Sequence, residues 1–255
     1  MAMRKSATNR AIWTSFTLKR HSRCMPPNAA VPSFLTLAMA EFGTFPRRGL
    51  VYLGAIGALS GLFDLFVWTQ QDDIPLLADV VLGALILGWF SACYASSMLM
   101  MKTRTSASGF GKFLATWVMM TTPSLLAAAL IILAFEWSNT PAYVAGGLMI
   151  IAGFVVLVLL PGWPIVQALS PSLIRPLQAL RATRGYRWGL TLTAFLSSTL
   201  NRLVPTTSST TDFATACVLA GAGIVVSVAS GMAIVSISVA AARLMDSKLR
   251  SAKLT

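Results

Sequence analysis

Six long apolar stretches alternate with short polar segments along this chain. They cover residues 49–68, 76–101, 113–135, 142–165, 188–204 and 213–242. Apolar runs of about 20 residues match the roughly 30 Å hydrocarbon core of a bilayer. The stretches lack the alternation of apolar and polar residues that membrane β-strands show. The pattern therefore predicts an all-α polytopic membrane protein, a bundle of six transmembrane helices.

Two further segments precede the first apolar stretch. Residues 33–46 have a spacing of apolar side chains that is typical of a short amphipathic helix in the membrane interface, with Phe34, Leu35, Leu37, Ala38, Phe42 and Phe45. Residues 1–32 are basic, with no acidic residue before Glu41. We therefore expect a disordered basic tail over 1–32 and a transmembrane domain over 33–255 that begins with an amphipathic pre-helix.

The basic residues fix the expected orientation. Nineteen of the twenty Lys and Arg residues fall into five clusters that all lie on one side of the predicted membrane, because they occupy the two ends of the chain and alternate connections between the apolar stretches. The connections on the other side carry Asp72, Asp73, Glu136 and Asp212. Cytoplasmic loops of membrane proteins collect Lys and Arg. The pattern predicts that both termini lie in the cytoplasm and that the protein is a multi-pass protein of the bacterial inner membrane.

The composition supports the membrane assignment over a nucleic-acid-binding one. The chain has 56% hydrophobic and 11% charged residues and a mean hydropathy of +0.72, whereas soluble domains carry about 25% charged residues. The net charge of +12 sits beside apolar spans, where it meets anionic lipid headgroups, and is not gathered on one soluble face as nucleic-acid binding requires. The bilayer and its anionic lipids are the expected partners, together with other protein subunits, and nucleic acid is not.

The basic start of the chain admits two interpretations. No apolar core follows its charges closely, which argues against a cleaved secretory signal. An acid-free start with Arg and Ser also resembles a mitochondrial transit peptide, whose absence from the mature chain would indicate an organellar protein. The cytoplasmic tail agrees better with the orientation that the loops predict.

Residues for catalysis or cofactor binding are scarce. The three cysteines, Cys24, Cys93 and Cys217, lack the spacing of a disulfide framework or a zinc site. The one histidine, His21, lies in the basic tail, so a Ser–His–Asp set or a haem held by two histidines within the membrane is not expected. We predict no catalytic, cofactor-binding or metal site, and a protein that is not an enzyme.

The segment over 161–188 is the first candidate for function. Pro161 and Pro164 end the fourth apolar stretch, because neither can continue a helical hydrogen-bond ladder. Beyond them, Leu173, Leu177 and Leu180 recur at helical spacing, with basic residues on other faces and in the following turn: Arg175, Arg181, Arg184 and Arg187. This pattern is typical of a helix on the inner leaflet and predicts a contact site for lipid or a protein partner. The alternative is an ordinary positive-inside loop.

The same segment carries a recognisable order of residues. It reads P-G at the end of one stretch, then P-x-x-A-L, then T-R-G-x-R-W at the start of the next, with Pro161, Gly162, Pro176, Ala179, Leu180, Thr183, Arg184, Gly185, Arg187 and Trp188. This order resembles the membrane domain fused to glycerophosphodiester phosphodiesterases, a family of bacterial six-helix membrane proteins with stand-alone relatives. The spacing between A-L and T-R-G is shorter here than is usual in that family. The resemblance implies a membrane-embedded scaffold or a transport-associated protein.

Ionisable residues within the apolar stretches form the second candidate, because each costs about 2.5–3.5 kcal/mol at a helix centre. Asp64, Asp79 and Arg202 all lie toward the outer end of their stretches. We expect them to form one intramembrane charge cluster, either as a structural ion pair or as a proton or substrate site. Gly57 and Gly61, four residues apart, predict a close helix contact in the first stretch.

These features favour a scaffold or accessory subunit in transport or lipid organisation. Two alternatives stay open: a permease subunit of an exporter that works with a separate ATPase, and a small proton-coupled carrier that uses Asp64 or Asp79. A co-purifying ATPase would indicate the first. Loss of transport on neutralising those carboxylates would indicate the second.

Overall fold

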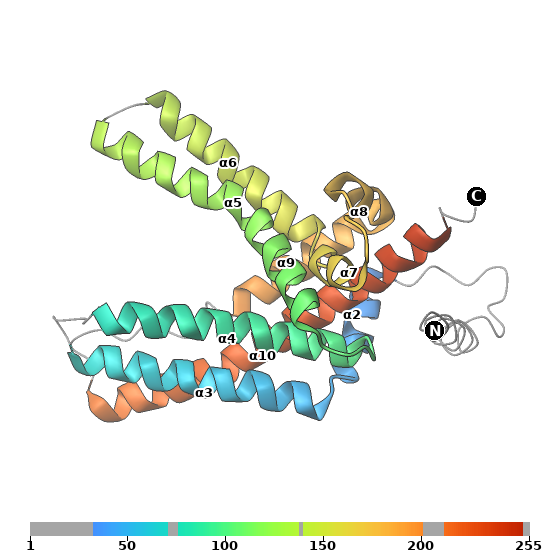
Figure 1. Ribbon diagram of the computed structural model, residues 1–255. Coiled ribbons are helices and arrows are strands. Elements are labelled where there is room, and N and C mark those ends of the chain that lie inside the picture. Colours follow the sequence, from blue (N-terminus) through green and yellow to red (C-terminus); the bar gives the residue numbers. More distant parts are fainter. Residues whose placement is uncertain (1–32, 71–75, 138–139, 201–211, 252–255) are drawn as a thin grey trace, which may run out of the picture. The chain divides into compact units, whose positions relative to one another are not determined.

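The helices of the computed structural model follow the apolar stretches of the sequence (Figure 1). The structure describes residues 33–70, 76–137, 140–200 and 212–251. Within those residues all regular structure is helical, and four helices are long and apolar enough to cross a membrane: α3 (Arg47–Gln70), α4 (Leu76–Met100), α5 (Ala107–Trp137) and α10 (Phe213–Ser251). These helices agree with a helical membrane protein. The count of six spans and the location of both termini stay predictions.

Helices α3, α4 and α10 pack against one another (Figure 1). The predicted close contact is present, because Gly57 and Gly61 of α3 lie against Ile224 of α10, and Gly57 also lies against Val228. A methyl group added at Gly61 would approach Ile224 to 2.6 Å. Small residues therefore bring these two helices together.

Helices α5 and α6 (Thr140–Leu159) form a second close pair (Figure 1). Gly146 of α6 lies against Ile131 of α5, and Gly153 lies against Ser124. An aromatic cluster connects α5 to α4: Tyr94 and Phe90 of α4 contact Phe110, Phe113 and Trp117 of α5. The Tyr94 hydroxyl also donates to the Ser106 carbonyl at 3.2 Å, directly before α5 begins.

Two helices end at other residues than the predicted apolar stretches do. The fourth helix ends at Leu159 and not near residue 165, because Pro161 lacks the N–H that an uninterrupted helix needs. After a turn, α7 (Trp163–Leu169) begins with Pro164 in its first turn, where the missing N–H does no harm. The last helix continues past 242 to Ser251. Its final residues include Lys, Arg and Leu, which are good helix formers, so the charges do not end the helix.

A helix is present at the predicted pre-helix position, α2 (Phe34–Gly43), capped by the Ser33 side chain. Its buried residues, Phe34 and Ala38, pack with Leu190 of α9 (Arg187–Leu200) and with Ile237 and Ala240 of α10. The inner face of the helix therefore contacts protein. Its place in the membrane interface stays a prediction.

The turn after α4 is a left-handed helix cap. Lys102 has a φ of 55°, its N–H donates to the Leu99 carbonyl, and the Thr103 N–H donates to the Met98 carbonyl at 2.9 Å. These two hydrogen bonds form a Schellman motif, in which glycine is the favoured residue at the left-handed position, here Lys102.

Lys102→Gly is expected to stabilise the protein by about 1 kcal/mol, because glycine adopts this conformation without strain from a Cβ atom. The measurement is the thermal unfolding midpoint in detergent. Arg104→Gly is the matched control. It removes the same charge in the same connection, but from a residue whose φ is not positive. An equal rise for both variants would contradict the explanation.

Candidate functional site

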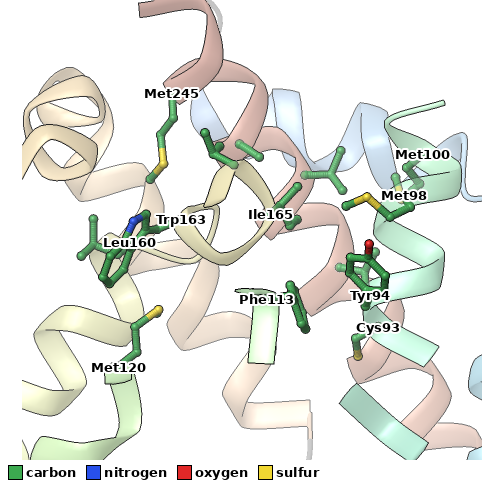
Figure 2. Packing of buried hydrophobic residues seen from close by; sticks show 14 of the residues in the cluster. Cys93, Tyr94, Met98, Met100, Phe113, Met120, Leu160, Trp163, Ile165 and Met245 are labelled. Carbon is green, nitrogen blue, oxygen red and sulfur yellow. The ribbon is translucent and has the colours of Figure 1, made fainter. Parts of the chain in front are cut away.

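Three buried residues, Trp163, Gln167 and Thr183, hold the 161–188 segment in place, and we call them the buried frame. Within α7, five consecutive residues from Trp163 to Gln167 are buried. The Trp163 indole Nε1 donates to the Ile174 carbonyl at 3.0 Å. Figure 2 shows Trp163 beside Leu160, between Met120 of α5 and Met245 of α10. The frame is therefore anchored in the hydrophobic core.

Gln167 closes the loop that follows α7. Its side-chain Oε1 accepts from the Ile174 N–H at 2.8 Å, and its Nε2 donates to the Ser172 carbonyl at 3.2 Å. Gln167 is 5% exposed, and its bond to the Ile174 N–H is buried, where an unsatisfied polar group costs about 1–3 kcal/mol. Gln167 thus determines the conformation of residues 172–174.

Two longer connections tie this segment to the long helices. Lys112 of α5 donates from Nζ to the Ser170 carbonyl at 2.9 Å. The Thr183 hydroxyl lies 3.5 Å from the carbonyl of Leu159, the last residue of α6, and is fully buried. The sequence analysis did not single out Lys112, so this structural role was missed.

The helix predicted after the loop is α8 (Pro176–Ala182), and it is shorter than the leucine spacing indicated. Leu173 precedes it, because the residue before Pro176 is held in the extended conformation, with φ −68° and ψ 141° at Arg175. The inward face carries the fully buried Ala179 and Thr183. Leu177 and Arg181, four residues apart, share the outward face, so the prediction that Arg181 lies on a different face from Leu177 was wrong.

All four candidate arginines have exposed side chains. Arg175 caps α8, Arg181 lies in α8, Arg184 begins the short 3₁₀ helix η1 (Arg184–Tyr186), and Arg187 begins α9. Among the described residues, the two ion pairs are Glu41–Arg243 and Asp246–Arg250, and neither includes them. Three exposed apolar side chains accompany them, Leu173, Leu177 and Trp188. The segment over 173–188, which we call the basic surface, therefore presents unpaired cations beside apolar groups.

The second candidate, the predicted intramembrane charge cluster, lies only partly within the described residues. Asp64 of α3 and Asp79 of α4 are both exposed, and neither forms an ion pair there. Arg202 lies outside the described residues. The charge cluster of these three residues stays a prediction.

An ion pair that the sequence analysis missed joins three helices. The Arg243 guanidinium of α10 lies 2.6 Å from the Glu41 carboxylate of α2 and donates to the carbonyl of Met100, the last residue of α4, at 2.9 Å. The Glu41 side chain is 12% exposed and that of Arg243 is 49% exposed. Burial raises the pKa of Glu41, and the nearby Arg243 opposes that shift. One signal was readable: Glu41 is the first acidic residue of the chain, in a region rich in Lys and Arg.

Arg243→Gln is expected to destabilise the protein by about 1–3 kcal/mol at pH 7, because it leaves the less exposed Glu41 carboxylate without its partner. The raised pKa of Glu41 in the folded state means that folding takes up a proton. Stability is therefore greatest below the unfolded pKa and falls as pH rises through the folded pKa. The loss in Arg243→Gln should thus be larger at neutral pH than near pH 4.5.

Unfolding in detergent at a series of pH values measures this effect. Glu41→Gln is the control, since the more exposed Arg243 stays solvated, and we expect a smaller loss at neutral pH and a flatter pH profile. A loss in Arg243→Gln that does not change with pH would contradict the role given to Glu41.

In comparisons with family models, with curated proteins and with solved structures, the chain matches none. The resemblance over residues 161–188 therefore stays a prediction. The structure does give several of its residues a packing role: Gly162, Ala179 and Thr183 are buried against neighbouring elements.

Proposed function

We propose that this protein is a non-enzymatic, multi-pass protein of the bacterial inner membrane that acts as a scaffold or accessory subunit in lipid organisation or transport. Both termini lie in the cytoplasm in this proposal. One observation carries it: the basic surface is exposed, yet its backbone is held by the buried frame of Trp163, Gln167 and Thr183.

The argument rests on what such an arrangement can do. A surface that keeps one conformation can bind a partner without first losing conformational entropy. An ordinary loop that served only topology would need its charges but no buried hydrogen-bonded support. The frame therefore favours a contact role for the basic surface over that of a plain connecting loop.

Two measurements test the proposal. Native mass spectrometry of the protein from its own membranes in mild detergent is expected to show retained lipid or a bound protein subunit. Proteoliposomes that contain the protein alone should show no proton-coupled flux. Flux that disappears in Asp64→Asn or Asp79→Asn, with folding intact, would indicate a carrier and overturn the scaffold. A co-purifying ATPase would indicate the permease subunit.

A further inference from the structure

We infer that the basic surface binds anionic phospholipid headgroups, with the arginines on the phosphates and Leu177 and Trp188 in the adjacent acyl region. This inference names the partner of the proposed scaffold and so rests on the proposed function. It goes beyond that function by choosing lipid over an acidic protein.

The charges of the basic surface lack acidic neighbours in sequence. No Asp or Glu occurs between Glu136 and Asp212, and the two ion pairs of the described residues lie elsewhere. A guanidinium group presents a planar fork of donors that matches a phosphate in bidentate geometry. Four such groups within thirteen residues, from Arg175 to Arg187, are complementary to a layer of phosphates.

The apolar groups decide between lipid and a soluble acidic partner. Trp188 is 88% exposed and Leu173 is 78% exposed, the two highest values among the exposed large hydrophobic residues of the described part. Leu177, which is 65% exposed, lies on the same face of α8 as Arg181. A headgroup layer above an acyl layer satisfies both kinds of side chain within a few ångströms, and tryptophan is enriched at that depth.

The buried side of α8 fixes which face meets the membrane. Ala179 and Thr183 are both fully buried, and Ala179 belongs to the main hydrophobic cluster. Rotation of α8 about its axis would expose these residues and bury Leu177 and Arg181. The outward face is therefore held in place before any lipid binds.

The test counts lipids bound to the purified full chain by native mass spectrometry. Phosphatidylglycerol and phosphatidylcholine with identical acyl chains are titrated in parallel. We expect the wild-type chain to retain phosphatidylglycerol preferentially. Each arginine near an anionic surface contributes about fivefold in affinity, so Arg181→Gln combined with Arg184→Gln should lower this preference roughly 25-fold.

Lys102→Gln combined with Arg104→Gln is the matched control. It removes the same charge from an exposed turn that carries no strongly exposed large apolar side chain, and it should leave most of the preference intact. Leu177→Gln tests the apolar half without changing charge and should lower retention about tenfold, as expected when a leucine side chain no longer enters the acyl region. Thermal unfolding midpoints equal to wild type confirm that each variant is folded.

Three results of the lipid titration would overturn the inference. They are a wild-type chain with no preference for phosphatidylglycerol, an unchanged preference in the double arginine variant, and an equal loss in the control. Retention of an acidic protein through these arginines, with no lipid preference, would also overturn it. None of these results touches the flux measurement that tests the proposed scaffold, so the two failures are distinguishable.

Discussion

Gly162→Ala is expected to destabilise the protein by about 3 kcal/mol, among the largest effects of any single methyl group in the described residues. Gly162 lies in the turn between α6 and α7, directly against the backbone of α10. An added Cβ atom would lie 2.7 Å from the carbonyl carbon of Ala241 and 2.9 Å from its Cβ, and would also collide with the backbone nitrogen of Ala242. These atoms belong to the middle of a long helix and cannot move aside, unlike the end of a flexible side chain.

The measurement is the fraction of monodisperse protein after detergent extraction, together with its thermal unfolding midpoint. Gly185→Ala is the matched control in the same segment, because no atom lies within 4 Å of its added Cβ and its φ is not in the left-handed region. We expect no loss of stability in that control. Wild-type stability in Gly162→Ala would show that α7 and α10 do not make this contact.

Gly162 also marks a limit of prediction from sequence. Pro161 predicted an end to the fourth helix, and α6 ends shortly before it, at Leu159. The Pro161-Gly162 pair did not predict that the turn touches Ala241 and Ala242, some eighty residues later. That contact depends on how helices pack, and every apolar helix in a membrane chain offers many small residues for such packing.

Local features of the basic surface were likewise predictable from sequence, and the contacts between distant residues were not. Exposure of the four arginines was predictable, because their charge keeps them out of the core. The orientation of α8 was not, since Ala179 and Thr183 are inconspicuous in sequence beside three leucines. The Glu41–Arg243 pair joins residues about two hundred positions apart, and nothing in the local pattern of either segment identifies its partner.

Apolar length therefore predicts which elements can cross a membrane, whereas the charges after residue 242 do not mark the end of α10. α3 and α4 agree with the predicted stretches to within about two residues, whereas α5 begins at Ala107, before the predicted residue 113, and α10 continues to Ser251, beyond the predicted residue 242. Which buried polar groups meet is a property of the assembled structure. Gln167 shows this, since a lone glutamine in an apolar run gave no sign that it would bond both Ser172 and Ile174.

Trp163→Ala is expected to be the most damaging side-chain truncation in the frame, at about 3–5 kcal/mol. Trp163 is 2% exposed and belongs to the main hydrophobic cluster, together with residues of α5 and α10. The change leaves a cavity there and also removes the donor to the Ile174 carbonyl. Because Ile174 directly precedes Arg175, we expect the basic surface to lose its fixed conformation together with stability.

Trp163→Phe separates these two effects. Phenylalanine fills much of the cavity but cannot donate to Ile174, so we expect a smaller loss of about 1–2 kcal/mol and a folded protein. Lipid counting by native mass spectrometry should then show a weaker preference for phosphatidylglycerol, although every arginine is still present. A lowered unfolding midpoint with an unchanged lipid preference would mean that the arginines act through charge alone, and that the frame serves only the stability of the bundle.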